Sequence, residues 1–185
     1  MASVSDFRRG MVIRFNNDLY GVVEFQHVKP GKGAAFIRTK LKNIKTGKVV
    51  DNTFRMSEKI EEVRLETKTM QYLYRDGEQL VFMDPDTYDQ ATVDADLLGE
   101  QVGFLKEGNT ANLLYHEKQA ISAELPITVD LEVTEAQPVA RGDTAGNITN
   151  TVTLETGTEI QVPPFIKQGD VIKIDTRSGK YLSRS

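Results

Sequence analysis

The sequence predicts an all-β protein built from three small barrel domains. Apolar and polar residues alternate with a period of two over short stretches, and turn signals recur about every ten residues, as is typical of short antiparallel strands. Helical periodicity is scarce. At 185 residues the chain is long enough for two or three small domains, and breaks near Glu66 and at Pro126 divide it into three units. We expect domains at residues 1–64, 65–127 and 128–185.

The first unit is predicted to be a strand meander. Two long strands, LYGVVEFQHVK and AAFIRTKLKNI, flank the loop PGKG, and VVDNTFR follows the turn KTGK as a third strand. The arm from Val23 to Pro30 would reach roughly 23 Å at about 3.3 Å per residue, which is long for a strand of a small barrel. We therefore expect the PGKG loop to project beyond the body of the domain.

The second and third units are predicted to contain five short strands each. The second has the hairpin MQYLYRDGEQLVFMD, a helix over residues 91–109 that stops at Gly108 and Asn109, and the strands ANLLYH and ISAELP. The third has the strand ITVDLEVTEA, a glycine-rich loop, and the hairpins NTVTLETGTEIQVPPF and GDVIKIDTRSGKYLS. Five strands with a helix or loop in the middle indicate Greek-key barrels of the OB type.

Charge is distributed unequally along the chain. The formal net charge is −4, yet residues 1–63 carry twelve Lys and Arg against seven Asp and Glu. No acidic residue occurs between Phe25 and Val50, and no basic residue occurs between Asp76 and Leu105. We expect the N-terminal unit to meet a polyanion, whereas the middle of the chain either repels it or faces a basic partner.

Residues that would support catalysis are sparse. Cysteine is absent, which excludes disulfides, thiol nucleophiles and zinc–thiolate sites. The two histidines are widely separated, and His27 is most simply a half-exposed strand residue. Asp84, Asp86 and Asp89 lack the EF-hand spacing and are more typical of a solvated acidic loop. PGKG lacks the spacing of a phosphate-binding loop. We therefore expect a protein that is not an enzyme, with no catalytic residue, metal or cofactor.

Lys32 in the PGKG loop has two interpretations. In the simpler one, the glycines supply positive φ angles and Lys32 only keeps an exposed turn in solution. In the second interpretation, the hairpin positions the Lys32 ammonium group against a distant, negatively charged binding partner. The features that favour it are strands without acidic residues, a long arm, and a loop entry that Pro30 stiffens. The surroundings of the loop favour the second interpretation.

Stretches along the whole chain resemble the bacterial elongation factor P family, in the same order. FQHVKPGKGAAFIRTKLKNIKTG is similar to the first-domain hairpin of that family, and later matches are ETKTMQYLYRDGEQLVFMD, ELPITVDLEV, ARGDTAGNITN, ETGTEIQVPPFIKQGD and GKYLSRS. The resemblance implies a KOW/SH3-like barrel followed by two OB barrels, with an L-shaped outline like that of tRNA. The archaeal and eukaryotic relative lacks the third domain, so residues 128–185 favour the bacterial form.

The resemblance also implies a function and its partners. Members bind the ribosome beside the peptidyl-tRNA and relieve stalling at consecutive prolines, which react poorly because the proline ring fixes φ. The tip lysine is implied to restrain the CCA end, so that the ribosome's own centre reaches a reactive geometry. The expected partners are the 70S ribosome, peptidyl-tRNA, rRNA and an enzyme that modifies Lys32. We expect a monomer.

Two groups of site residues are expected in the first domain. The resemblance assigns Lys32 as the modified tip, within a loop formed by Pro30, Gly31 and Gly33. Relatives with lysine at the tip carry β-lysyl or aminopentanol-type groups, and the sequence leaves open which applies. The acid-free run adds our own inference of phosphate contacts, at Lys29, Arg38, Lys40 and Lys42. Because side chains alternate along a strand, the last three would share one face.

Two further groups of site residues are carried over from the family to the third domain. Gly142, Asp143 and Thr144 match a loop that approaches the exit-site codon, although a flexible hairpin connection is the simpler alternative. Tyr181 and Arg184 match a tail that lies near the anticodon stem in relatives.

A second function remains open from the sequence. The chain could be a non-catalytic structural RNA-binding protein of barrels, in which Lys32 is one phosphate contact among several, and Lys32→Ala would separate the two functions. No apolar run approaches the length of a membrane span and the N-terminus lacks a signal-peptide core, so we expect a cytoplasmic protein with no membrane partner.

Overall fold

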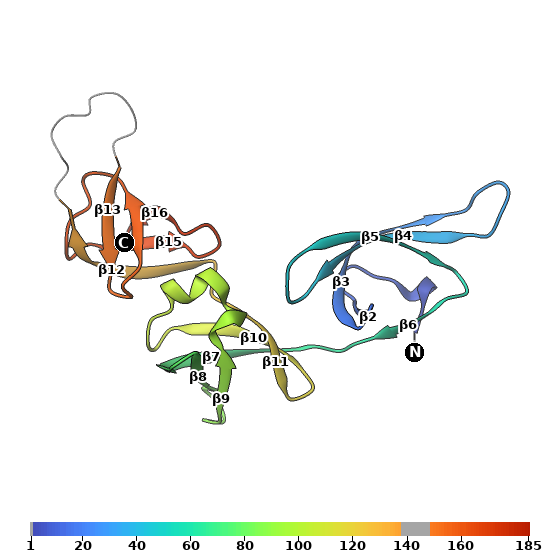
Figure 1. The fold of residues 1–185 in the computed structure, drawn as a ribbon, viewed down its shortest axis with the longest axis horizontal. Coiled ribbons are helices and arrows are strands. Elements are labelled where there is room, and N and C mark those ends of the chain that lie inside the picture. Colours follow the sequence, from blue (N-terminus) through green and yellow to red (C-terminus); the bar gives the residue numbers. More distant parts are fainter. Residues whose placement is uncertain (1, 138–148) are drawn as a thin grey trace. The chain divides into compact units, whose positions relative to one another are not determined.

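The computed structural model describes residues 2–137 and 149–185, and most regular structure in these residues is β-strand (Figure 1). The strands form one six-stranded and two five-stranded sheets, which confirms the predicted all-β fold of three small sheet domains. The chain divides into two compact units, Met1–Thr67 with Leu114–Ser122 and Lys68–Leu113 with Ala123–Ser185. Each unit is described by itself.

The first sheet contains the predicted meander and three shorter strands. Its order is β1-β6-β2-β3-β4-β5, and all neighbouring pairs are antiparallel. The strands are β1 (Ala2–Ser3), β2 (Val12–Phe15), β3 (Asp18–Val28), β4 (Phe36–Asn43), β5 (Val49–Arg55) and β6 (Lys59–Glu62). A 3-10 helix, η1 (Val4–Asp6), follows β1. The sequence does not predict β1, β2 or β6, because two to four residues are too few to show a period.

Strand β4 shows how the sequence places the core of this domain. Ile37 and Leu41 are fully buried on one face, while Arg38, Lys40 and Lys42 alternate with them on the exposed face. The buried face packs on Phe7, Ile13, Val22, Phe54 and other members of one apolar cluster. The three basic side chains are therefore held on the outer face of a rigid sheet.

The β3–β4 hairpin extends beyond the rest of this unit, as predicted (Figure 1). Pairing continues to Val28 opposite Phe36, and β5 supports the hairpin up to the pair of Phe36 with Arg55. Beyond that pair, residues 29–35 form the connecting loop, and residues 29–34 are exposed. The loop is thus carried on a three-stranded base.

The second sheet has the order β11-β10-β7-β8-β9. Its strands are β7 (Glu66–Asp76), β8 (Gln79–Met83), β9 (Gln90–Asp94), β10 (Thr110–His116) and β11 (Gln119–Glu124). The predicted hairpin is β7–β8, which turns at Gly77, where φ is +59°. Strands β10 and β11 match the predicted segments ANLLYH and ISAELP.

The helix predicted over residues 91–109 is wrong. The segment begins inside β9 and continues as two 3-10 helices, η2 (Ala95–Leu97) and η3 (Gly99–Phe104). The Asp94 side chain accepts a hydrogen bond from the Asp96 backbone N–H and so caps η2, and Gly99, the first residue of η3, has φ of +55°. Within residues 2–137 and 149–185, no helix is long and apolar enough to cross a membrane.

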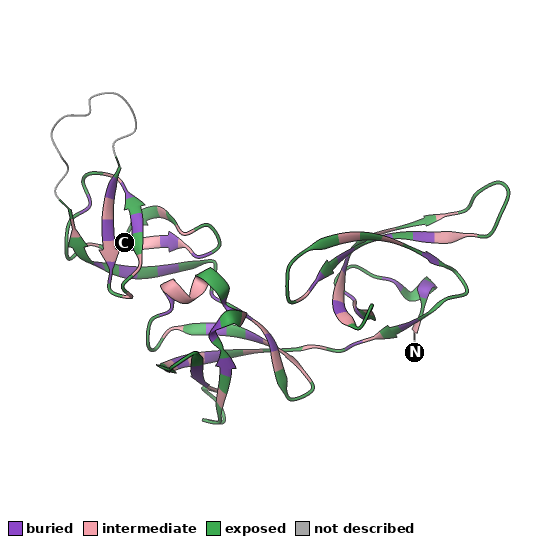
Figure 2. Cartoon of the chain, in the orientation of Figure 1, coloured by how far each residue is buried: buried purple, intermediate pink, exposed green. Residues whose placement is uncertain are grey.

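The third sheet has the order β14-β13-β12-β15-β16, and its two outer strands, β14 and β16, lie near each other. Its strands are β12 (Thr128–Ala136), β13 (Asn150–Leu154), β14 (Glu159–Val162), β15 (Val171–Asp175) and β16 (Lys180–Arg184). Strand β12 alternates between buried and exposed residues (Figure 2), with Val129, Leu131 and Val133 facing the core.

Candidate functional site

The loop between β3 and β4 exposes Lys32 at its tip. Pro30, Gly31 and Gly33 are also exposed, and Gly33 has φ of +115°, a conformation that side-chain-bearing residues rarely adopt. Gly31 does not have a positive φ, so only one of the two glycines serves the turn in the predicted way. Lys32 makes no ion pair or hydrogen bond with any residue that the structure describes, which leaves its ammonium group available to a partner.

The exposed face of β4 carries the predicted phosphate contacts, with one qualification. Arg38, Lys40 and Lys42 share this face, but Lys40 Nζ lies 3.3 Å from Glu24 Oε2 on β3. Glu24 precedes the acid-free run in the sequence, yet the strand register places it directly opposite Lys40. The charge of Lys40 is therefore partly neutralised in the free protein.

Arg38 and Lys42 keep their charge available. The Arg38 guanidinium lies 5.7 Å from the centroid of the Phe36 ring, a cation–π contact that orients the side chain without neutralising it. Lys42 and the exposed Lys29 form no ion pair within the described part of the chain. These three cations, with Lys32, form the basic surface of the hairpin.

A polar network fixes the end of the hairpin farthest from the tip. Asn43 is buried, and its side-chain N–H donates to Asp18 Oδ2 at 2.7 Å. Its carbonyl oxygen accepts from the backbone N–H groups of Lys45 and Thr46 at 2.8 and 2.9 Å. The hydrogen bonds from Asn43 and from the Leu19 backbone hold the pKa of Asp18 below its ordinary value. This network sets the turn KTGK and the start of β5.

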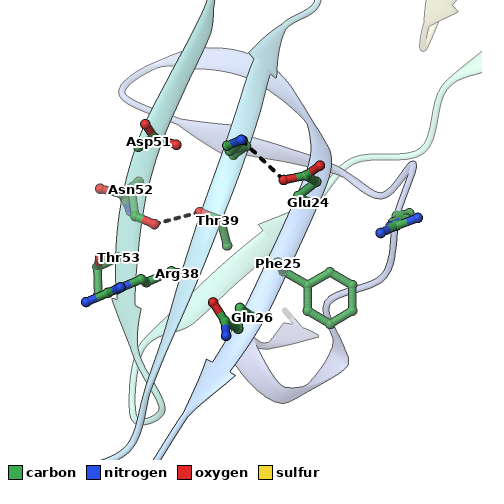
Figure 3. Close-up of a pocket in the computed structure, with 10 residues that line it drawn as sticks. Glu24, Phe25, Gln26, Arg38, Thr39, Asp51, Asn52 and Thr53 are labelled. Atoms are coloured by element: carbon green, nitrogen blue, oxygen red, sulfur yellow. Dashed lines mark hydrogen bonds and ion pairs between the residues drawn. The ribbon is translucent and has the colours of Figure 1, made fainter.

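A hollow of about 730 Å³ lies at the root of the hairpin (Figure 3). Three neighbouring strands each contribute three consecutive residues to it, Glu24–Gln26, Arg38–Lys40 and Asp51–Thr53, and Arg9 completes the lining. No sequence pattern predicts that Phe25, Asn52 and Arg9 lie together, because Phe25 and Asn52 are aligned by the strand register and Arg9 comes from a separate loop.

The acidic loop of the second domain uses its own backbone as a partner. Asp84 Oδ1 accepts hydrogen bonds from the backbone N–H groups of Asp86 and Thr87, and these bonds hold the pKa of Asp84 below its ordinary value. Among the described residues, no group of three His, Cys, Asp or Glu side chains is arranged to hold a metal ion.

The predicted sites of the third domain are partly described. Both residues lie in β16, where Tyr181 is half-buried opposite Ile174 and Arg184 is exposed opposite Ile172. They belong to the other compact unit, so the structure does not join them to the hairpin. The loop residues Gly142, Asp143 and Thr144 lie outside the described residues.

Three family models match the chain in succession. They are the elongation factor P KOW-like domain over residues 3–60, the elongation factor P OB domain over residues 65–123, and the elongation factor P C-terminal domain over residues 129–184. Together they correspond to the three sheets described above, and the first two name a KOW-like domain and an OB domain.

Proteins named elongation factor P are similar over the full chain. The one from Chloroflexus aggregans is 54% identical over 184 residues, which are 98% of this chain and 97% of that protein. The one from Maridesulfovibrio salexigens is 51% identical over 184 residues, with 100% and 99% coverage.

Solved structures agree on the fold of part of the chain. Translation initiation factor 5A from Methanococcus jannaschii has a TM-score of 0.50 at 20% identity, covering 68% of this chain and 92% of that one. A translation initiation factor of the same family from Naegleria fowleri has a TM-score of 0.50 at 18% identity, covering 67% and 96%. With the three matching domain models and more than half of its residues shared with full-length relatives, the chain belongs to the elongation factor P family.

Proposed function

We propose that this translation elongation factor binds the ribosome beside the peptidyl-tRNA and speeds peptide-bond formation at consecutive prolines through Lys32. The observation that carries the proposal is the exposed Lys32 at the end of a supported hairpin, with no partner among the described residues, in a chain that matches its family from end to end. A narrow hairpin can enter an RNA crevice that a globular barrel cannot.

The proposed mechanism is one of positioning. The barrel and β5 hold the hairpin rigid, and the Lys32 side chain, lengthened by a modifying enzyme, lies along the CCA end of the peptidyl-tRNA. Restraining that end restores a reactive geometry that the proline ring disfavours. The ribosome supplies the bond chemistry, and the factor needs no nucleophile, base or metal of its own.

The basic surface of the hairpin supplies affinity. Lys29, Arg38 and Lys42 would neutralise RNA phosphates directly, whereas Lys40 would first have to leave Glu24. We therefore expect Arg38→Glu with Lys42→Glu to weaken ribosome binding more than Lys40→Glu does alone. In the third domain, Tyr181 and Arg184, with the loop Gly142–Thr144, are proposed as secondary contacts to tRNA and the exit-site codon.

The test is synthesis of a Pro-Pro-Pro reporter in a reconstituted translation system that lacks this factor. Protein from its native host should restore the reporter, Lys32→Ala should not, and Lys48→Ala, an exposed lysine away from the tip, should behave as the native protein does. The mass of Lys32 is measured in the same preparations. A native protein with a confirmed extension on Lys32 that fails to restore synthesis would refute the proposal.

The second candidate is a structural RNA-binding protein, favoured by the exposed cations on β4. In that case Lys32→Ala removes only one phosphate contact, and the slope of log affinity against log salt falls by about one unit, with reporter synthesis unaffected. Under the proposed function, the same substitution abolishes stimulation while most of the binding remains.

A further inference from the structure

The hollow at the root of the hairpin takes a row of three side chains from the core-facing side of the sheet. Phe25 pairs with Thr39 across β3 and β4, and Thr39 pairs with Asn52 across β4 and β5, so the three side chains share one face. Thr39 is buried and Phe25 packs on the apolar core, which identifies this face as the inner one. The lining residues that flank each of them, Glu24, Gln26, Arg38, Lys40, Asp51 and Thr53, alternate with them along the three strands.

Thr39 is a buried residue of the lining, and its hydroxyl group cannot donate a hydrogen bond to a ligand because it already donates one within the sheet. Its hydroxyl donates to the Asn52 backbone carbonyl at 2.9 Å, which ties β4 to β5 beneath the hollow (Figure 3). The core-facing row and Arg9 together offer a ligand an aromatic ring, a carboxamide and a guanidinium.

These three groups are available in the free protein. The Asn52 carboxamide and the Arg9 guanidinium make no hydrogen bond or ion pair with any described residue. The Phe25 ring has one edge-on neighbour, His27, whose ring centroid lies 5.8 Å away, and it is only partly buried. Glu24 does not compete for Arg9, because its carboxylate is held by Lys40 on the outer face.

The combination matches the chemistry of a nucleotide. An aromatic ring stacks on a base, a carboxamide offers a donor and an acceptor in the pattern that adenine complements, and a guanidinium binds a phosphate in bidentate geometry. The volume of about 730 Å³ lies within the range of small-ligand sites. We propose that this hollow is a nucleotide-binding site, with Phe25 under the base, Asn52 on its edge and Arg9 on its phosphate, and with adenine preferred over uracil.

The site is separate from the role proposed for Lys32. The nucleotide could be free in solution or presented by a single-stranded segment of RNA, and the chemistry that recognises it is the same in both cases. Its test needs no ribosome, so its failure would leave the proposed function untouched.

The experiment is a titration of the full-length, isotope-labelled chain, followed by the NMR signals of its backbone amides. The probes are adenosine monophosphate, uridine monophosphate, inorganic phosphate and a short oligoadenylate. We expect adenosine monophosphate to shift the signals of Phe25, Thr39 and Asn52 in a saturable way. Uridine monophosphate should bind more weakly, and inorganic phosphate should leave Phe25 unmoved. Tighter binding of the oligoadenylate at the same signals would assign the site to an RNA strand, and equal binding would assign it to a free nucleotide.

Matched variants distinguish specific binding in the hollow from nonspecific electrostatic attraction between the protein and a nucleotide. Phe25→Leu, which keeps an apolar side chain against the core, should weaken binding roughly ten-fold through loss of stacking. Arg9→Gln should weaken it as well, whereas Arg64→Gln, which removes the same charge from an exposed position outside the hollow, should not. Asn52→Ala should abolish the preference for adenine, and thermal unfolding confirms that each variant is folded. The proposal would be overturned if no nucleotide shifted the amide signals of Phe25, Thr39 and Asn52. It would also be overturned if Arg9→Gln and Arg64→Gln lost the same amount of binding affinity.

Discussion

Two junctions between neighbouring parts of this chain are built from opposite chemistry. Where the β10–β11 hairpin meets the first barrel, Leu19, Val63 and Ile121 form a small buried apolar cluster. Where η3 of the second domain meets the β13–β14 hairpin of the third, hydroxyls, a carbonyl and an ion pair make the contact. The stability of the first junction depends on how much apolar surface is buried, whereas that of the second depends on the positions of individual donor and acceptor atoms.

The polar junction is centred on the carbonyl oxygen of Gly103. The hydroxyls of Thr156 and Thr158 both donate to it, at 2.6 and 2.7 Å, and so use both of its lone pairs. Beside it, Lys106 Nζ lies 2.9 Å from Glu155 Oε2, and Glu155 Oε1 also accepts from the Glu132 backbone at 2.9 Å. Hydrogen bonds lose strength steeply with angle, so this contact fixes an orientation, whereas apolar burial is not directional.

The largest effect is expected at the apolar junction. Ile121→Ala removes a buried side chain and leaves a cavity, so the free energy of unfolding should fall by about 2–4 kcal/mol. Ile127, a few residues later, is 58% exposed, and Ile127→Ala should cost less than about 0.5 kcal/mol. Urea unfolding of both variants measures the difference, and equal losses would show that the cluster contributes no more than an exposed surface does.

The next effect is a steric one at the polar junction. A Cβ atom on Gly103 would lie 2.6 Å from Thr158 Oγ1, closer than any real contact, so Gly103→Ala should destabilise the protein by about 1–3 kcal/mol. Thr158→Ala removes the obstructing oxygen. The double variant should therefore lose less than the sum of the single variants, and strict additivity would refute the predicted clash.

The features that the sequence predicts correctly depend on local periodicity, whereas the contacts that it does not predict depend on which strands or loops lie next to each other. Strand β4 was predictable because Ile37, Leu41 and the basic residues between them alternate regularly, and the same period predicted the shared face of Arg38, Lys40 and Lys42. A period identifies which residues face the core, but not which residue lies opposite on the next strand. The pairing of Glu24 with Lys40 and the row of Phe25, Thr39 and Asn52 are consequences of register.

The failed helix has a different cause. Residues 91–109 contain apolar residues at helical spacing and a glycine stop, but Val93 and Ala95 are buried on either side of a strand end. Asp94 then caps a 3-10 turn, and Gly99 adopts a positive φ that interrupts the helical path. The carbonyl of Gly103 is consequently free to accept the two threonine hydroxyls, a contact over more than fifty residues of sequence that no local pattern records.

A smaller effect is expected from the ion pair of the polar junction. Partial burial acts to raise the pKa of Glu155, but the hydrogen bonds from Glu132 and Lys106 and the charge of Lys106 outweigh it and leave the pKa below its ordinary value. A lowered pKa in the folded state means that the ionised group stabilises the fold above its ordinary pKa and loses this effect as the pH falls. Glu155→Gln should thus cost about 1 kcal/mol at neutral pH and nothing in acid.

The control for this prediction is Glu159→Gln. Glu159 is exposed in β14 and makes no ion pair among the residues described, so its substitution should leave the free energy of unfolding nearly unchanged at every pH. A Glu155→Gln variant whose deficit stays constant between neutral and acid pH would show that the charge of Glu155 does not contribute.

The smallest effect on stability is expected from the ion pair between Arg177 and Asp175, which connects two residues of a single turn. The Arg177 side chain donates to both carboxylate oxygens of Asp175, and this pair, with the backbone N–H groups of Arg177 and Ser178, lowers the pKa of Asp175 to about 2. In Arg177→Gln, an NMR titration should show the pKa of Asp175 rising toward its ordinary value. The backbone bonds remain, so the return should be incomplete.

The midpoint of thermal unfolding of Arg177→Gln should nevertheless stay close to that of the native protein. Both partners are two residues apart on one surface turn, so breaking the pair separates no domains and leaves no buried charge. Glu155 and Asp175 thus have pKa values lowered for similar reasons, but only Glu155 joins segments from two barrels. A large loss of stability in Arg177→Gln would contradict this distinction, because it would mean that a lowered pKa, rather than the segments a carboxylate connects, measures its contribution to the fold.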